Sequence, residues 1–135
     1  MSYKPLSHRL PVWLQYVVTC VSAGVYALIG TFAHRAGAIN NMPYGLFMAF
    51  MLIVLSAWCA RSRNGRHGLV AHMIVSTVVV WLIALGFFGN AIVIPVGFGG
   101  FVPWFSQYAG YIWLFGILVV HLVLLCMPQR WFVIE

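Results

Sequence analysis

Long uninterrupted runs of apolar residues, separated by short polar or basic segments, dominate the pattern along this chain. The first run covers residues 13–32, and about 20 apolar residues are what a helix needs to cross roughly 30 Å of hydrocarbon. Three further runs cover 45–60, 69–88 and 108–127. The third is rich in Val and Ile, but its uninterrupted apolar length outweighs its β-propensity. The pattern predicts an all-α, integral membrane four-helix bundle, with residues 1–135 as one domain.

The segments between the runs hold the residues that end helices. Pro43 follows two asparagines and fits the first turn of the next helix, and Pro128 closes the last run. The segment 89–107 contains four glycines and two prolines and yet is apolar. An irregular backbone exposed to lipid would leave amides unpaired, at several kcal/mol each. We therefore expect this segment to form an outer loop that caps the bundle, lies at the interface or dips in against protein; an interfacial cap is favoured over a re-entrant loop.

Composition supports a lipid environment. Only 6% of the residues are charged, 64% are hydrophobic and the mean hydropathy is +1.00, whereas soluble domains carry about 25% charged residues. The formal net charge of +6 could suggest nucleic-acid binding. Because the cations lie between the apolar runs, we interpret them as membrane-flanking charges and expect no nucleic-acid partner.

The distribution of these cations predicts an orientation. Four crossings would place both termini and the basic segment 61–68 on one side. That side carries six Lys or Arg residues, and the other carries one, Arg35. The positive-inside rule then predicts a multi-pass protein of the cytoplasmic (inner) membrane with both termini cytoplasmic. The residues expected to contact lipid headgroups and set this topology are Arg61, Arg63, Arg66 and Arg35.

Two histidines are candidate ligands. His72 lies about one turn into the third run and His121 about two turns before the end of the fourth, so both lie at similar depth. Intramembrane ionisable residues are costly and often functional. We expect no cofactor, but the alternative is that the pair ligates a b-type haem or a metal. Cys126 follows His121 by five residues, about 140° round the helix, and so does not share its face.

Catalytic signatures are missing from the sequence. No Asp or Glu lies in any apolar run, and no CxxC, Walker, HExxH or GxSxG pattern occurs. A hydrolytic site would need a base, and only histidines remain. We therefore expect a non-catalytic accessory or structural membrane protein. Its expected partners are membrane lipid and other membrane subunits or a second copy. The small residues Ala23, Ala27 and Thr31 indicate ordinary packing within the bundle or, alternatively, a docking face for such a partner. The alternatives are a small oligomeric permeation unit and the haem- or metal-binding protein described above.

Short motifs add a resemblance. The chain contains Gly30-Thr31-Phe32-Ala33-His34-Arg35 and Met42-Pro43-Tyr44-Gly45-Leu46, and later Ile92-Val93-Ile94-Pro95 and Gly110-Tyr111-Ile112-Trp113-Leu114. In these it resembles a family of small four-helix integral membrane proteins of actinobacteria. The resemblance spans most of the chain. It implies four spans and a cytoplasmic-membrane location, and it implies no activity.

Overall fold

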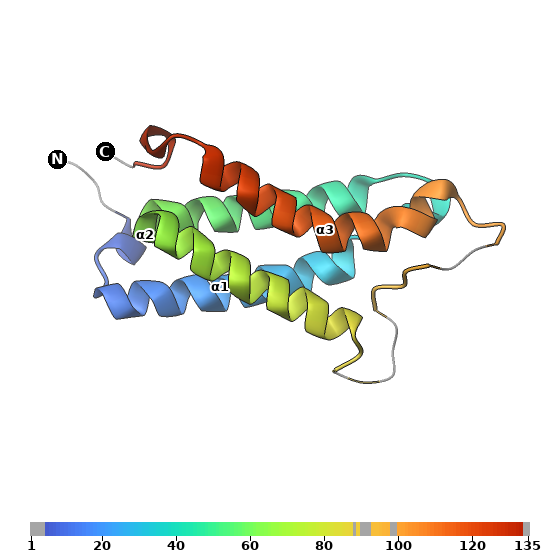
Figure 1. The fold of residues 1–135 in the computed structure, drawn as a ribbon, viewed down its shortest axis with the longest axis horizontal. Coiled ribbons are helices and arrows are strands. Elements are labelled where there is room, and N and C mark those ends of the chain that lie inside the picture. Colours follow the sequence, from blue (N-terminus) through green and yellow to red (C-terminus); the bar gives the residue numbers. More distant parts are fainter. Residues whose placement is uncertain (1–4, 88, 90–92, 98–99, 134–135) are drawn as a thin grey trace.

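The computed structural model describes residues 5–87, 89, 93–97 and 100–133, which form helices and connecting turns and no strand (Figure 1). The α-helices are α1 (Val12–Ala33), α2 (Tyr44–Ala84) and α3 (Trp104–Cys126), and the short 3-10 helices are η1 (Leu6–His8), η2 (Ala38–Asn40) and η3 (Gln129–Trp131). All three α-helices are long and apolar enough to cross a membrane. α1 exceeds the first predicted run by one residue at each end, and α3 begins four residues earlier than predicted.

The prediction of a four-helix bundle is wrong. Residues 45–60 and 69–88 do not form two helices: α2 is one element of 41 residues that includes most of both, and the basic segment between them is largely helical. Only Asn64 (φ −121°, ψ 16°) and Gly65 (φ 62°, ψ −148°) leave the helical region. The density of charge in this segment favours a loop, but a change of backbone conformation at two residues is enough to make the bend.

At this bend α2 doubles back on itself, so its two arms run side by side (Figure 1). The bend, η1 and η3 lie at one end of the molecule (Figure 1). A straight helix of 41 residues would be about 60 Å long, twice the thickness of the hydrocarbon layer. The arms approach closely near the bend, where a Cβ on Gly68 would lie 2.5 Å from the carbonyl oxygen of Ala60. Small residues on this face therefore let one arm pack against the other.

Polar contacts hold α3 at both ends. Near its start, the backbone N–H of Phe105 donates to Asn41 Oδ1 at 3.1 Å, and Arg35 donates to the carbonyl and hydroxyl oxygens of Ser106 at 3.2 and 3.0 Å. At its end, Arg61 donates to the carbonyl of Met127 at 2.7 Å. The N–H of Phe105 and the carbonyl of Met127 are backbone groups that a helix leaves unpaired at its termini.

Between these ends the core consists of apolar side chains from all three helices. Trp113 of α3 is fully buried and its ring lies 5.4 Å from that of Phe50 on α2. The segment between α2 and α3 contributes Ile94, which is 2% exposed. A Cβ on Gly110 would lie 2.5 Å from the carbonyl oxygen of Pro95. The described part of the predicted outer loop thus packs against α3, while residues 90–92 and 98–99 lie outside the described residues.

Candidate functional site

The fold brings His72 and His121 into direct contact. His72 lies on the second arm of α2 and His121 on α3, and both side chains are fully buried. His72 Nδ1 lies 2.9 Å from His121 Nε2, with ring centroids 5.1 Å apart. The equal depth inferred from the sequence therefore corresponds to a real pair. The pair is joined by a hydrogen bond between the two rings.

The hydrogen bonds on either side of the pair fix which nitrogens carry protons. His121 Nδ1 lies 2.7 Å from the carbonyl oxygen of Ile117, which only accepts, so this nitrogen carries the hydrogen. In a neutral ring His121 Nε2 is then an acceptor, and His72 Nδ1 donates to it. His72 Nε2 is in turn an acceptor, and Ser56 Oγ lies 2.8 Å from it. The hydroxyl of Ser56 therefore donates to His72, and His72 donates to His121.

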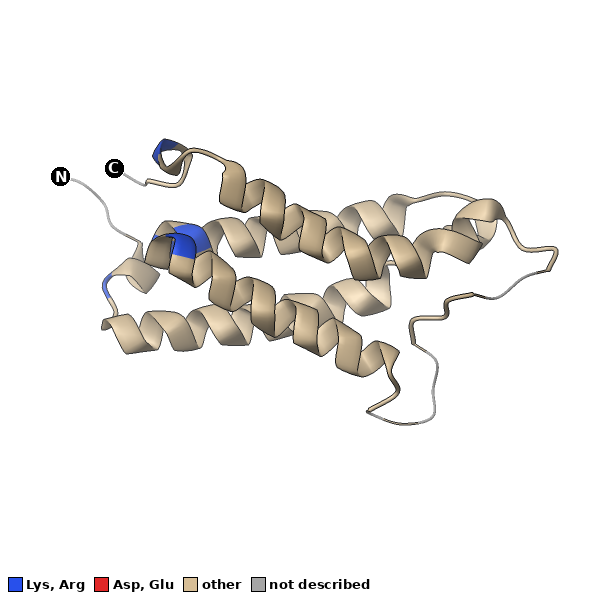
Figure 2. Cartoon of the chain, viewed as in Figure 1, with Lys and Arg blue, Asp and Glu red and all other residues tan. Residues whose placement is uncertain are grey.

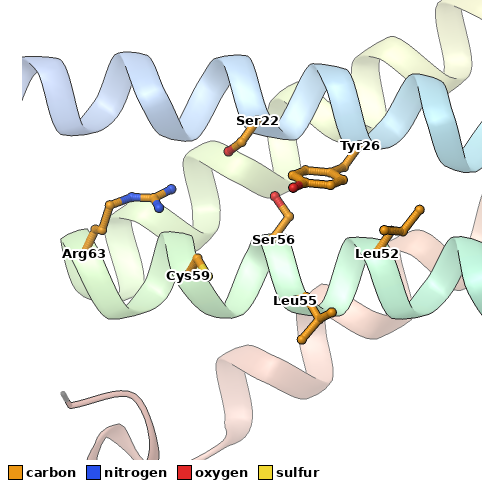
Figure 3. A pocket seen from close by; sticks show the side chains of 7 residues that line it. All are labelled: Ser22, Tyr26, Leu52, Leu55, Ser56, Cys59 and Arg63. Atoms are coloured by element: carbon orange, nitrogen blue, oxygen red, sulfur yellow. The ribbon is translucent and has the colours of Figure 1, made fainter. Parts of the chain in front are cut away.

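Ser56 also lines a pocket between α1 and the first arm of α2 (Figure 3). The pocket has a volume of about 240 Å³ and is lined by Ser22, Tyr26, Leu52, Leu55, Ser56, Cys59 and Arg63. Cys59 and Leu55 are exposed, so the pocket opens on their side. Its polarity changes along its length, because Arg63 lies at one end and Leu52 at the other, with the hydroxyls between them (Figure 3).

The hydroxyl of Ser56 differs from those of Ser22, Thr31 and Ser76, whereas Ser62 on the same helix also has an imidazole partner, His8 Nε2 at 3.0 Å. Ser22, Thr31 and Ser76 each donate to a carbonyl of their own helix, at 3.0, 2.7 and 3.2 Å. Such back-bonding is the ordinary way to satisfy a hydroxyl in a helix. Ser56 donates across the fold to the imidazole of His72. Its oxygen is therefore polarised by a base and lies at the wall of a pocket.

The predicted topology residues have different environments. Arg61 is fully buried within the protein, with its guanidinium 4.0 Å above the ring of Phe132. Arg63 is half-buried and donates to Thr19 Oγ1 at 3.1 Å, and Arg66 is exposed. The cations gather around the bend and the termini (Figure 2). Their role in setting topology stays a prediction.

The distance between the ring nitrogens of His72 and His121 can be compared with that expected for two ligands of a haem iron or another metal ion. Two imidazoles on opposite sides of one metal ion would hold their nitrogens about 4 Å apart, because metal–nitrogen bonds are about 2.0 Å long. The nitrogens of His72 and His121 are 2.9 Å apart and already bonded to each other. The described residues contain no group of three or more His, Cys, Asp or Glu that could hold a metal ion. In this structure the two side chains form a hydrogen-bonded pair, and the haem and metal alternatives stay predictions.

A third buried histidine, His34, directly follows the last residue of α1. His34 donates from Nδ1 to the carbonyl of Thr31, and its ring stacks on Trp113 with centroids 5.9 Å apart. Trp113 in turn donates to the hydroxyl of Thr31 at 3.2 Å. Burial, with a smaller contribution from the neighbouring charge of Arg35, lowers the pKa of His34 from 6.5 to about 4. His34 is therefore neutral at physiological pH and joins α1 to α3.

Comparison of the chain with protein-family models, curated proteins and solved structures finds no match. The resemblance to small actinobacterial membrane proteins thus stays a prediction. Sequence reasoning missed Ser56, although it is the only hydroxyl residue in the apolar run 45–60. A single hydroxyl residue in an otherwise apolar run was the feature that could have marked Ser56 as a candidate. It could not identify His72 as the partner, because the two residues meet only after α2 doubles back.

Proposed function

We propose that this chain is an integral membrane protein that binds an anionic acyl lipid in the pocket between α1 and α2. The observation that carries the proposal is the polarity of the pocket lining. Arg63 lies at the end nearest the bend, the hydroxyls of Ser22, Tyr26 and Ser56 follow, and leucines line the other end. An anionic lipid has the same order of groups: a charged head, ester oxygens and then hydrocarbon.

The size and openness of the pocket support a lipid held by its head and ester region. Pockets that enclose a small ligand measure about 300–1,000 Å³, and this one measures about 240 Å³. It therefore suits part of a lipid, with the acyl chains extending past Leu55 along the exposed apolar surface. Arg63 provides a charge for the headgroup, and its Nε is buried and has no hydrogen-bond partner among the described residues.

We propose that the bend and both termini face the cytoplasm. This orientation is supported by the gathering of cations at that end of the molecule (Figure 2) and by the positive-inside rule. An activity reporter fused after Glu135 is expected to be active only in the cytoplasm, and activity outside would contradict the orientation. The accessory role remains compatible with lipid binding. A pore is less well supported, because Trp113, Ile53 and Ile117 fill the described interior of a single copy.

Lipid selectivity tests the proposal. The protein in nanodiscs is titrated with phosphatidylglycerol or phosphatidylcholine, and retained lipids are counted by native mass spectrometry. Arg63→Gln is expected to lower the preference for phosphatidylglycerol about tenfold or more, because hydrogen bonds to charged groups contribute about 1.5–3 kcal/mol. Arg66→Gln removes the same charge from an exposed position at the same bend and should lower it less than threefold. Equal effects of the two substitutions would show general surface electrostatics and overturn the proposed pocket.

A further inference from the structure

We propose that Ser56 is the nucleophile of an acyl-transfer site, with His72 as its base and His121 as the residue that positions His72. This inference rests on the proposed function, because the substrate is an ester-linked acyl lipid bound in the same pocket. It reverses the expectation that the protein is not an enzyme. The observation that suggests it is one continuous line of hydrogen bonds, from a pocket hydroxyl through two imidazoles.

Each link in this line has the geometry that serine acyl transfer needs. A nucleophilic serine requires a base within about 2.6–3.2 Å, and that base must be oriented by a third group. Ser56 Oγ lies 2.8 Å from His72 Nε2, and His72 Nδ1 lies 2.9 Å from His121 Nε2. His121 is itself held by the carbonyl of Ile117, so only one neutral tautomer of His72 fits. In that tautomer Nε2 is free to accept the proton of Ser56.

A polar contact between helices would explain the hydrogen bonds alone, since interhelical bonds stabilise membrane bundles. A purely structural contact would not explain why the row of hydrogen bonds ends at a hydroxyl in the wall of the pocket. Both imidazoles are fully buried, whereas the hydroxyl of Ser56 belongs to the wall of the pocket. Only the nucleophilic end is therefore offered to a ligand. The same pocket holds the hydroxyl of Tyr26, which lies beside Ser56 (Figure 3) and is a donor suited to the negative charge that develops on an ester oxygen.

The depth of Ser56 also suits an ester. It precedes Asn64 at the bend by eight residues, or about 12 Å along the helix. The polar layer of each leaflet is about 5–8 Å thick. With the bend at the outer edge of the headgroups, Ser56 lies about 4–7 Å below the boundary between the polar layer and the hydrocarbon. Ester groups of acyl lipids occupy this boundary.

The reaction consists of two balanced steps. Ser56 Oγ attacks the ester carbonyl carbon and forms a new C–O bond, while its proton moves to His72 Nε2. The bond from that carbon to the alcohol oxygen breaks, and His72 returns the proton to the departing alcohol. Water, the second substrate, then attacks the acyl-serine as His72 takes one of its protons. The bond to Ser56 breaks, the fatty acid leaves, and Ser56 regains its proton from His72.

An active-site probe tests this inference. The detergent-solubilised full chain is incubated with an alkyl fluorophosphonate, and the modified residue is found by peptide mass spectrometry. We expect an adduct on Ser56 that is absent from Ser56→Ala, whereas Ser76→Ala, which changes a buried hydroxyl outside the pocket, retains it. His72→Gln should slow labelling about 10²–10⁴-fold, the usual contribution of a general base. Failure of the folded wild-type protein to form this adduct overturns the inference without relying on any variant.

The positioning role of His121 has a separate readout. Gln retains an acceptor at about the place of Nε2 and Leu does not, so His121→Gln should label within tenfold of wild type and His121→Leu at least 100-fold more slowly. Equal labelling by both would overturn this role. If Ser56 stays unlabelled while the phosphatidylglycerol preference still depends on Arg63, acyl transfer is wrong and lipid binding stands. If Ser56 is labelled and that dependence is absent, the acyl-transfer site stands and its assignment to an anionic lipid is wrong.

Discussion

Gly65 at the bend of α2 offers the sharpest test of the fold. Its φ of 62° and ψ of −148° lie in a region that residues with a side chain essentially do not occupy. A Cβ added there would meet no heavy atom within 4 Å. The cost of Gly65→Ala is therefore conformational, with no steric clash, and is about 1–3 kcal/mol. Alanine also restricts the unfolded chain, which offsets about 0.4–1 kcal/mol. We expect a net destabilisation of about 1–2 kcal/mol.

Gly24 provides a matched control. It lies inside α1, and a Cβ there would also meet no heavy atom within 4 Å. Gly24→Ala should stabilise the protein by about 0.5–1 kcal/mol, because alanine is the better helix former. Unfolding of both variants by SDS titration in mixed micelles, followed by tryptophan fluorescence, measures the difference. A Gly65→Ala variant as stable as Gly24→Ala would refute the glycine-dependent bend, and with it the approach of the two arms.

Two further predictions concern the opposite end of the molecule. Asn41→Ala removes the acceptor for the backbone N–H of Phe105 at the start of α3. Losing such a helix cap costs about 1 kcal/mol of stability. The control Asn40→Ala, whose side chain does not bond this N–H, should cost less in the same SDS titration. The pKa of His34 is about 4 in the folded protein and 6.5 when unperturbed, so the unfolded state binds more protons between these values and stability falls as the pH drops from 6.5 to 4. The free energy of unfolding falls by about 3 kcal/mol at most. The difference in unfolding free energy between pH 7 and pH 4.5 should be smaller in His34→Gln than in the wild type. An equal difference in both proteins would contradict the lowered pKa of His34.

Apolar run length was enough to predict α1 and α3, because crossing a bilayer constrains helix length more than any local preference does. The bend of α2 was harder to predict. Charge density suggested a loop, but the backbone conformation there depends on Asn64 and Gly65 alone. Burial of Arg61 was also unexpected, since its place beside Phe132 and the Met127 carbonyl depends on how the C-terminal segment folds back. Such contacts join residues far apart in the chain and leave no periodic signal.

The candidate site also has one part that the sequence indicates and another that depends on how the helices pack. Depth alone paired His72 with His121, because residues at one level of a bundle can meet. Ser56 shares that level but lies on the other arm of α2, and its contact with His72 requires the particular rotation of both arms. The pocket depends on α1 as well, through Ser22 and Tyr26. The sequence therefore indicated the two histidines, as possible ligands of a haem or a metal, and did not indicate Ser56, which lines the pocket.

The two imidazoles have one more consequence. Their line of hydrogen bonds stops at the carbonyl of Ile117, an oxygen inside α3 that holds no transferable hydrogen. A proton taken up at the Ser56 side has no described exit beyond His121 and must leave by the way it came. The arrangement suits reversible proton transfer between Ser56 and His72. It is unsuited to carrying protons from one face of the bilayer to the other.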